Sequence, residues 1–268
     1  MTSRRIPAVL SIAGSDSGGG AGIQADLKAF ARCGVHGMTA ITAITAQNTV
    51  GVEAVESVPS PMVLDQIYAV GSDIGIDAVK VGMLGTPETV EGVVAALALT
   101  FHEAPAVVDP VMVAESGAVL LDERTRETLV IRLLPMATVV TPNIPEARVL
   151  TGLGESATQE ELARGVLALG SKAVVVTGGH SEGLVDLFCD AERVVEIPGE
   201  RHPAGAAHGS GCTHSSALAA FLAHGCEPLE AARRARQIAS EAVANGLREI
   251  GKGAGPVDVF GLREGQWQ

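Results

Sequence analysis

Two hydrophobic patterns alternate along most of this chain. Short apolar runs, rich in β-branched residues and bounded by turn residues, predict buried strands over Ala8–Ala13, Met38–Thr45, Ala78–Val81, Ala106–Asp109, Thr138–Val140 and Ala173–Thr177. Longer segments with apolar residues at helical spacing predict helices over Ala21–Arg32, Met62–Ser72, Pro87–Thr100, Glu123–Leu134 and Gln159–Leu169. The alternation predicts an α/β fold in which helices cover both faces of a mostly parallel central sheet.

The last third of the chain departs from this alternation. Leu184–Cys189 and Arg193–Pro198 are short strand-like runs close together, which predicts a small hairpin at the edge of the sheet. Two longer helical patterns, Thr213–His224 and Pro228–Leu247, follow. Because no polar linker or low-complexity segment divides residues 1–268, we expect a single domain.

Composition narrows the classes of function. A formal net charge of −12 argues against a nucleic-acid partner, because polyanions require a basic surface. Cys33, Cys189, Cys212 and Cys226 have no zinc-ligand spacing and, in a chain this long, predict reduced thiols. Met1–Pro7 lacks the apolar core of a signal peptide, and no apolar run approaches the roughly 20 residues of a membrane span. We therefore expect a cytoplasmic protein without membrane contact.

Ligands of open α/β sheets bind beyond the carboxyl ends of the strands, so the residues that follow each predicted strand are candidates. After the first strand, the glycine-rich segment Gly14–Gly22 lets the backbone approach a ligand closely, although it matches neither the dinucleotide fingerprint nor a Walker A sequence. Asp26, in the next helix, is by default a solvated carboxylate. Gln47, after the second strand, offers the donor and acceptor that suit a heterocycle edge, but polar residues are also ordinary in loops.

Two further strand ends carry carboxylates. Asp109 is a candidate partner of magnesium, or else a residue that organises its loop. Asn143 and Glu146 have the spacing of a capping box, with Pro145 in the first helical turn. Glu146 can also hold Mg²⁺ through water while Asn143 faces a nucleotide phosphate, and the two roles are compatible.

The strand over Val174–Val176 leads into Thr177, Gly178 and Gly179, a glycine turn suited to close contact with a nucleotide. The residue that follows, His180, is interpreted as an exposed loop histidine.

The segment His208–Thr213, with the sequence His-Gly-Ser-Gly-Cys-Thr, precedes an apolar helical run. Ser210 is a good helix N-cap, and the free N–H groups of the first helical turn, with the helix dipole, form an anion site. Cys212 at that position is expected to have a lowered thiol pKa, with its sulfur beside the bound anion. A glycine turn that caps a helix, with Cys212 as apolar filler, explains these six residues equally well.

Taken in order, these segments resemble the hydroxymethylpyrimidine kinase / phosphomethylpyrimidine kinase family of the ribokinase-like superfamily. The resemblance covers nearly the whole chain and rests on Ser11–Asp16 with the glycine run, Gly22–Lys28, Ala46–Thr49, Val81–Leu84, Asp109–Met112, Thr141–Asn143 with Pro145–Glu146, and His208–Thr213. It implies a three-layer sandwich, a homodimer, and two phosphorylations by ATP with Mg²⁺ in thiamine biosynthesis. The first acts on 4-amino-5-hydroxymethyl-2-methylpyrimidine and the second on its monophosphate.

The resemblance also implies which residues bind the small-molecule substrate. Asp26 and Gln47 would hydrogen-bond the aminopyrimidine edge. Gly14, Met83 and Val111 would line the ring pocket.

For the nucleotide and the metal, the implied residues lie on later strands. Asp109 and Glu146 would serve the magnesium. Asn143, Thr177 and Gly179 would lie at the nucleotide.

Catalysis is assigned by the resemblance to the segment before the long apolar helix. Gly209, Gly211 and Cys212 would form the anion hole for the transferred phosphoryl group. Sugar kinases of the superfamily carry an aspartate base where this chain has Cys212. The thiolate either accepts the proton of the substrate hydroxyl, which the comparison slightly favours, or only positions the hydroxymethyl group.

Two departures from the family pattern concern lysines. Many members have lysine where this chain has Thr177, and often another where it has Glu115. Phosphate neutralisation must then come from elsewhere, and Lys252 is a candidate. The chain has three other lysines: Lys28, Lys80 and Lys172.

Other functions remain as alternatives. Pyridoxal or pyridoxine kinase activity is the main rival, since related enzymes overlap in substrate. A sugar kinase is disfavoured by Cys212 and by the presence of Gln47. A non-catalytic pyrimidine-binding protein is the alternative from a different class.

Overall fold

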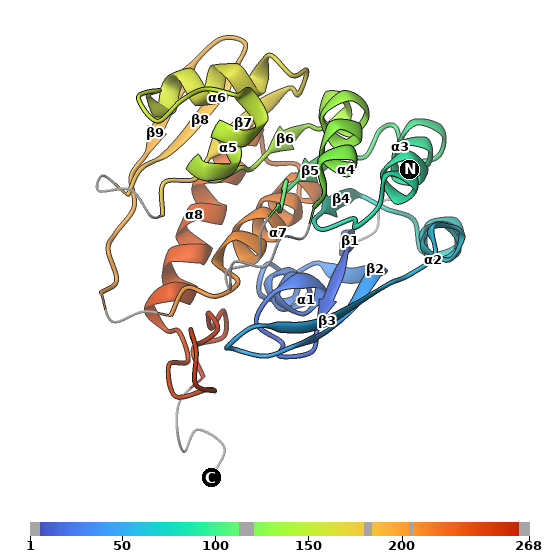
Figure 1. Cartoon of the computed structure of the whole chain (residues 1–268), viewed down its shortest axis with the longest axis horizontal. Coiled ribbons are helices and arrows are strands. Elements are labelled where there is room, and N and C mark those ends of the chain that lie inside the picture. Colours follow the sequence, from blue (N-terminus) through green and yellow to red (C-terminus); the bar gives the residue numbers. More distant parts are fainter. Residues whose placement is uncertain (1–5, 113–120, 180–183, 204–205, 263–268) are drawn as a thin grey trace.

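One sheet runs through the molecule, whose computed structural model describes residues 6–112, 121–179, 184–203 and 206–262 (Figure 1). In these residues the sheet has nine strands in the order β3-β2-β1-β4-β5-β6-β7-β8-β9. The strands are β1 Ala8–Asp16, β2 His36–Gln47, β3 Val52–Ser57, β4 Ala78–Val81, β5 Ala106–Val108, β6 Val139–Val140, β7 Ala173–Val176, β8 Asp186–Asp190 and β9 Val194–Ile197. The six central strands β2, β1, β4, β5, β6 and β7 run parallel, whereas β3, β8 and β9 pair antiparallel at the edges.

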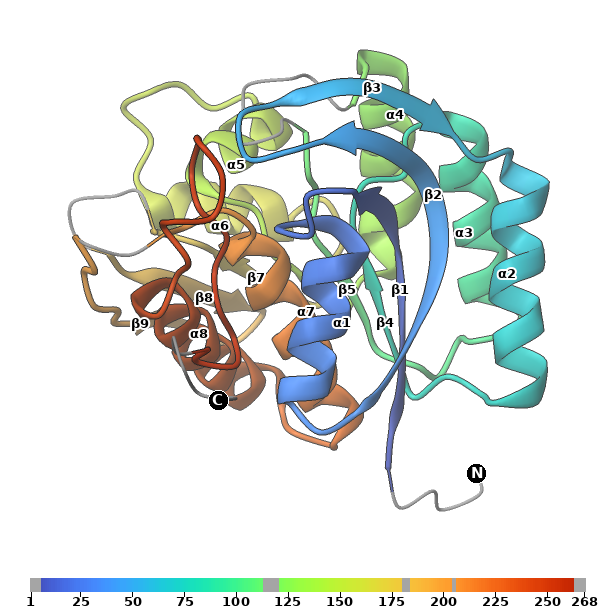
Figure 2. The same cartoon turned by 90° about the horizontal axis from the view of Figure 1, so that it is seen from below.

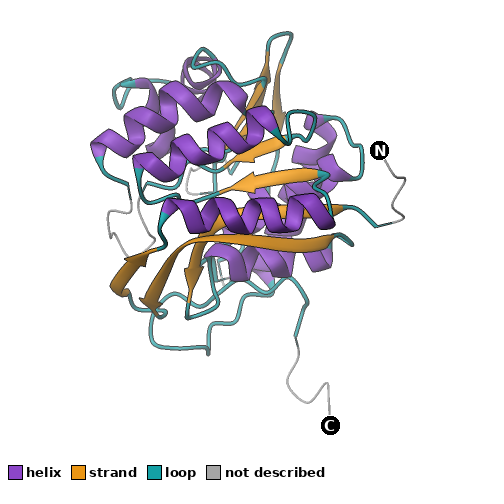
Figure 3. Cartoon of the chain, turned by 90° about the vertical axis from the view of Figure 1, so that its right-hand side faces the viewer, coloured by secondary structure: helices purple, strands orange, loops and turns teal. Residues whose placement is uncertain are grey.

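Helices cover the two faces of this sheet (Figure 3). They are α1 Gly22–Arg32, α2 Ser60–Asp73, α3 Pro87–Leu99, α4 Glu123–Thr128, α5 Ile144–Thr151, α6 Gln159–Leu167, α7 Ser210–Ala223 and α8 Pro228–Ala244. Each face of the sheet carries its own hydrophobic cluster. The first is covered by α1, α7 and α8, and the second, on the opposite face, by α2 to α6 (Figure 2). Leu10 and Ile12 of β1 belong to the second cluster and Val9 to the first, because successive strand residues point to opposite faces. This is the predicted three-layer α/β sandwich.

The parallel strands bring their carboxyl ends to one edge of the sheet, and that edge positions the site. The loops after β1, β4, β5, β6 and β7 all leave from it, and α7 begins there. Segments more than 180 residues apart along the chain lie in contact at this edge. Gly209 approaches the Gly20 carbonyl so closely that a Cβ on Gly209 would overlap the carbonyl oxygen. The arrangement explains why residues predicted one strand at a time meet in one place.

The predicted strands and the edge hairpin are confirmed, with bounds that differ by up to three residues. The strand β3 was not predicted, because its residues are mostly exposed and it is held by pairing with β2 instead of by burial. The helix predicted over Glu123–Leu134 is regular only in α4 and continues as a wider π turn over Leu129–Leu133 and a 3₁₀ turn over Leu134–Met136. The capping-box spacing at Asn143 is confirmed as the start of α5.

Candidate active site

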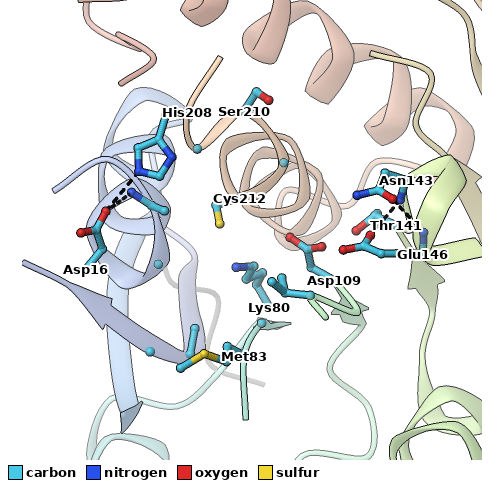
Figure 4. Close-up of a pocket in the computed structure, with 18 of the residues that line it drawn as sticks. Asp16, Lys80, Met83, Asp109, Thr141, Asn143, Glu146, His208, Ser210 and Cys212 are labelled. Carbon is cyan, nitrogen blue, oxygen red and sulfur yellow. Dashed lines mark hydrogen bonds and ion pairs between the residues drawn. The ribbon is translucent and has the colours of Figure 1, made fainter. Parts of the chain in front are cut away.

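A cavity of about 490 Å³ lies across the carboxyl edge of the sheet (Figure 4). All but two of the predicted site residues line it. Those that do are Gly14, Gln47, Met83, Asp109, Val111, Asn143, Glu146, Thr177, Gly209, Gly211 and Cys212. The strand order therefore gives the cavity two ends, one around β2, β1 and β4, and the other around β6 and β7, with β5 and the first turn of α7 between them.

The glycine-rich loop after β1 is organised by Asp16. Its carboxylate accepts hydrogen bonds from the backbone N–H groups of Gly18 at 2.7 Å, Gly20 at 3.0 Å and Ala21 at 2.8 Å. His208 Nε2 lies 3.4 Å from Asp16 Oδ2, which ties this loop to the segment before α7. Burial raises the pKa of Asp16, but the contacts with His208 and the three N–H groups outweigh burial, and the pKa falls below its ordinary value. Sequence reasoning missed this role of Asp16.

The turn before α7 leaves backbone donors open. Gly209 is the N-cap, with φ of 84°, and no side chain of the described residues caps the helix. The prediction of Ser210 as N-cap is wrong, because Ser210 is already the first helical residue. Among the described hydrogen bonds, Thr213 N–H reaches the Gly209 carbonyl at 2.9 Å, but none uses the N–H groups of Gly211 or Cys212. Free N–H groups at a helix N-terminus form an anion site.

The pKa of the Cys212 thiol is raised, whereas the sequence predicts that it is lowered. Burial raises the pKa of Cys212 to about 12, and the carboxylates of Asp26 and Asp109 add to the shift. The Lys80 ammonium and the Gly22 N–H act in the opposite direction without reversing it. The prediction of a lowered pKa is therefore wrong, because desolvation of the thiolate outweighs the helix terminus. At neutral pH the thiol of this site is protonated.

Asp109 and Glu146 face the same part of the cavity. Asp109 Oδ2 accepts a hydrogen bond of 2.8 Å from Ser215 Oγ in α7. Burial raises the pKa of Asp109, although the Lys80 ammonium and the Ser215 hydroxyl oppose the shift. Burial and the nearby Asp109 carboxylate raise the pKa of Glu146 to about 8. Two neighbouring carboxyl groups with raised pKa values, Asp109 buried and Glu146 half-buried, are a site where a divalent cation removes a repulsion, so these residues fit Mg²⁺.

The start of α5 is closed by its own side chains. Asn143 Oδ1 accepts from the Glu146 N–H at 2.8 Å, and Glu146 Oε2 accepts from the Asn143 N–H at 2.9 Å. The structural role predicted for this pair is thus confirmed. Both side chains still border the cavity. In the described residues no group of three or more His, Cys, Asp or Glu side chains is placed to hold a metal.

The predicted contact of Asp26 with the substrate is not supported, because Asp26 is fully buried and does not line the cavity. It is not a solvated carboxylate either. Its oxygens accept hydrogen bonds from Ser11 Oγ at 2.6 Å and Ser216 Oγ at 2.7 Å. They also hold Lys80 Nζ at 2.9 and 3.1 Å. Lys80 lines the cavity and was missed, although a lysine in the apolar run Ala78–Val81 was a visible signal.

Other predicted residues lie elsewhere. Gly179 does not line the cavity; the neighbouring Gly178 N–H donates to Asp186 Oδ1 at 2.9 Å. Lys252 is also absent from the lining, and its backbone N–H donates to Thr49 Oγ1 at 3.1 Å. Lys252 is therefore not supported as the substitute for a phosphate-binding lysine. The predictions for His180 and Glu115 fall outside the described residues.

Known proteins resemble this chain over nearly its full length. The model of the phosphomethylpyrimidine kinase family matches residues 16–258. A hydroxymethylpyrimidine/phosphomethylpyrimidine kinase of Rhizobium meliloti is 48% identical over 257 residues, which cover 94% of this chain and 96% of that protein.

Solved structures agree with this similarity. The crystal structure of a phosphomethylpyrimidine kinase from Clostridium difficile is 41% identical, with a TM-score of 0.77, and covers 88% of this chain and 99% of that one. The pyridoxal kinase of Staphylococcus aureus, in complex with AMP-PCP and pyridoxal, is 34% identical, with a TM-score of 0.86, and covers 96% of this chain and 94% of that one. These matches show the family: the chain belongs to the phosphomethylpyrimidine kinases.

Proposed function

We propose that this chain transfers a phosphoryl group from ATP to the hydroxymethyl group of 4-amino-5-hydroxymethyl-2-methylpyrimidine, and then a second to the monophosphate, as a step in thiamine biosynthesis. The main support for the proposal is the order in which polar and apolar side chains follow one another along the cavity. Gln47 and Met83 lie at one end, Asp109 after the central strand β5 lies in the middle, and Glu146 and Thr177, which follow β6 and β7, lie toward the other end. The names of its relatives support the same activity.

The acceptor end has the character of a pocket for a small planar ring. Gly14 leaves room there, since a Cβ on it would lie 2.6 Å from the Met83 methyl carbon. Gln47 supplies an amide that both donates and accepts, as an aminopyrimidine edge requires. Val111 adds an apolar wall.

At the other end the nucleotide would lie near Asn143 and Thr177. Complexes of the Staphylococcus aureus pyridoxal kinase with ADP and with AMP-PCP support the use of ATP. Asp109 and Glu146 would hold Mg²⁺, directly or through water. When bound, Mg²⁺ neutralises charge on the nucleotide phosphates.

Phosphoryl transfer depends on position and on charge stabilisation more than on covalent chemistry. The acceptor oxygen forms a bond to the γ-phosphorus while the bond to the leaving ADP oxygen breaks. In the first step the hydroxyl proton passes to an oxygen of the transferred phosphoryl group, and in the second step the attacking phosphate oxygen is already ionised. The N–H groups of Gly211 and Cys212 would bind oxygens of the group in transfer, and Gly209 gives the turn that opens them. We assign Cys212 the positioning role, because its thiol is protonated at neutral pH.

The decisive test is a coupled assay of the purified protein with Mg-ATP and the hydroxymethylpyrimidine, in which ADP release is followed and the phosphates on the product are counted. We expect ADP release and a diphosphate product. Absence of ADP would overturn the kinase proposal, and a product with one phosphate would restrict it to the first step.

Pyridoxal kinase activity is the second candidate. It is favoured by the close fit to the Staphylococcus aureus structure that contains pyridoxal. Parallel assays decide between the two, since a much larger kcat/KM for pyridoxal than for the pyrimidine would reverse the order of preference.

We also infer a cytoplasmic homodimer. Ile44, Val50 and Val55, on β2, β3 and their connection, are 56%, 65% and 48% exposed and offer an apolar face to a second copy. In the described residues no helix has both the length and the apolar character needed to cross a membrane. Light scattering coupled to size exclusion tests the oligomeric state, and a monomer mass at micromolar concentration would contradict the dimer.

A further inference from the structure

Lys80 is a buried cation at the floor of the cavity. It lies in β4 between Val79 and Val81, is fully buried, and borders the cavity with its ammonium between Cys212 and Asp109 (Figure 4). Among the described residues that line the cavity, it is the only lysine or arginine. In the part of the lining that the structure describes, one side chain thus carries a fixed positive charge, in a chain of net charge −12.

The surroundings hold the Lys80 ammonium in one place. Asp26 binds it at 2.9 and 3.1 Å, and Asp26 is itself fixed by the hydroxyls of Ser11 and Ser216. An ammonium has three N–H donors, and in the described hydrogen bonds Lys80 Nζ contacts only Asp26. Gly82 leaves the space beside it open, because a Cβ there would lie 2.9 Å from Nζ. The two described hydrogen bonds leave one of the three donors for a ligand in the cavity that Lys80 borders.

A purely structural ion pair explains this arrangement poorly. Desolvation of two buried charges often exceeds their attraction, so an apolar pair of similar size would be as stable or more stable. Burial alone would lower the pKa of Lys80, yet the nearby carboxylates of Asp26 and Asp109 raise it, so the ammonium stays charged. A charge that is costly to bury, permanently ionised and at the border of the cavity is suited to bind an anionic ligand.

We propose that Lys80 binds the acceptor: its ammonium donates a hydrogen bond to a phosphate oxygen of the monophosphate in the second step, and to the hydroxymethyl oxygen in the first. The role rests on the proposed function. Lys80 keeps its protons throughout and contributes charge and direction only. It does not replace the lysine missing at Thr177, since β4 and β7 are separated by two strands. It serves the acceptor and leaves the nucleotide to other groups.

This role predicts unequal effects on the substrates. A hydrogen bond between an ammonium and a phosphate is about twice as strong as one to a neutral hydroxyl. Loss of Lys80 should therefore raise the KM for the monophosphate by roughly 10- to 100-fold. The KM for the hydroxymethylpyrimidine should rise less, and the KM for ATP should change little.

The experiment needs a variant that folds. K80M alone leaves Asp26 buried without its partner and is expected to be unstable. The double variant D26N/K80M removes both charges together. Its amide oxygen still accepts from one of the two hydroxyls of Ser11 and Ser216, and its amide nitrogen donates to the oxygen of the other. The matched control is K172M, because Lys172 is an exposed lysine directly before β7 and outside the cavity.

Kinetics and calorimetry with the pyrimidine monophosphate are then measured on the wild type, D26N/K80M and K172M. The inference predicts a folded double variant with the selective rise in KM and a matching loss of affinity for the monophosphate, while K172M resembles the wild type. Wild-type affinity in folded D26N/K80M, or equal rises for the monophosphate and ATP, would overturn it. If the wild type transfers no phosphate, the proposed function fails, and calorimetry still decides whether Lys80 binds the phosphate.

Discussion

The helices α5 and α7 both begin at the cavity, yet their first turns are built in opposite ways. In α5 the side chains of Asn143 and Glu146 satisfy each other's backbone N–H groups. In α7 Gly209 provides no side chain, and the N–H groups of Gly211 and Cys212 make none of the described hydrogen bonds. A capped terminus has its donors occupied, whereas an uncapped one has donors for a ligand. The difference supports the proposal that α7 stabilises the phosphoryl group and that α5 holds Glu146 in position.

The largest effect is expected from breaking the open terminus with G209A. A Cβ at φ of 84° is strained, and it would overlap the Gly20 carbonyl, so the turn must move. Loss of aligned donors should lower kcat by about 100-fold or more. The matched control is G152A at the end of α5, with φ of 70° and nothing within 4 Å of the added Cβ.

G152A should lose about 1 kcal/mol of stability, as expected for a side chain in the left-handed region, and keep its kcat. Steady-state kinetics and thermal melts of both variants make the comparison. A wild-type kcat in G209A would contradict the proposal that the first turn of α7 forms the anion hole.

A smaller loss of activity is expected from D109N, which removes one of the two carboxyl groups, Asp109 and Glu146, of the proposed magnesium site. Removal of one of two proposed magnesium partners should lower kcat/KM on the order of 100-fold and raise the Mg²⁺ concentration needed for half-maximal rate. E91Q is the control, since Glu91 is half-exposed on α3 and pairs with Arg132. An unchanged Mg²⁺ dependence in D109N would contradict the assignment.

The same pair predicts how stability depends on pH. Glu146 has a pKa of about 8 in the folded chain against 4.5 as its ordinary value. A folded-state pKa above the unfolded one favours the protonated native form, so this contribution is fully present below pH 4.5 and is lost as pH rises through 8. Without Mg²⁺, the Tm of the wild type should decrease more than the Tm of E146Q when the pH is raised from 4.5 to 8. Equal slopes for the two proteins would contradict the raised pKa.

The smallest effect is expected at the closed terminus. N143A removes the cap of α5 and should cost about 1 kcal/mol of stability. Thr158 caps α6 through an equivalent capping box with Glu161, outside the cavity, so T158A should cost a similar amount. Only N143A should also lower kcat, because it releases Glu146. Denaturant unfolding and kinetics of the pair test this, and equal kcat values would show that the α5 cap is structural alone.

Prediction from sequence succeeded where burial or sequence order carried the information. The parallel strands are apolar on both faces, so their runs stand out, and their shared direction places Gly14, Asp109 and Thr177 at one edge. The exposed strand β3 lacked such a run. These signals depend on neighbours along the chain and on the repeating pattern of the fold.

The failures concern side chains whose surroundings come from distant segments. Asp26 points into the core because Ser11, Lys80 and Ser216 meet it there, and no spacing along the chain shows this. The pKa of Cys212 depends on desolvation by the folded protein, which outweighs the helix terminus visible in the sequence. Lys80 was visible as a residue, but its place in the cavity required the packing of α1 and α7 against β4.

The most direct test of the central claim is the amide spectrum of the ¹⁵N-labelled enzyme with Mg-ADP, aluminium fluoride and the hydroxymethylpyrimidine. Aluminium fluoride with ADP stands in for the phosphoryl group in transfer. Relative to the complex with Mg-ADP and the pyrimidine but without aluminium fluoride, the account predicts large downfield shifts of the Gly211 and Cys212 amide protons, and little change at Glu146, whose N–H is already bound by Asn143. Unchanged Gly211 and Cys212 signals in the saturated complex, or an equal shift at Glu146, would contradict it.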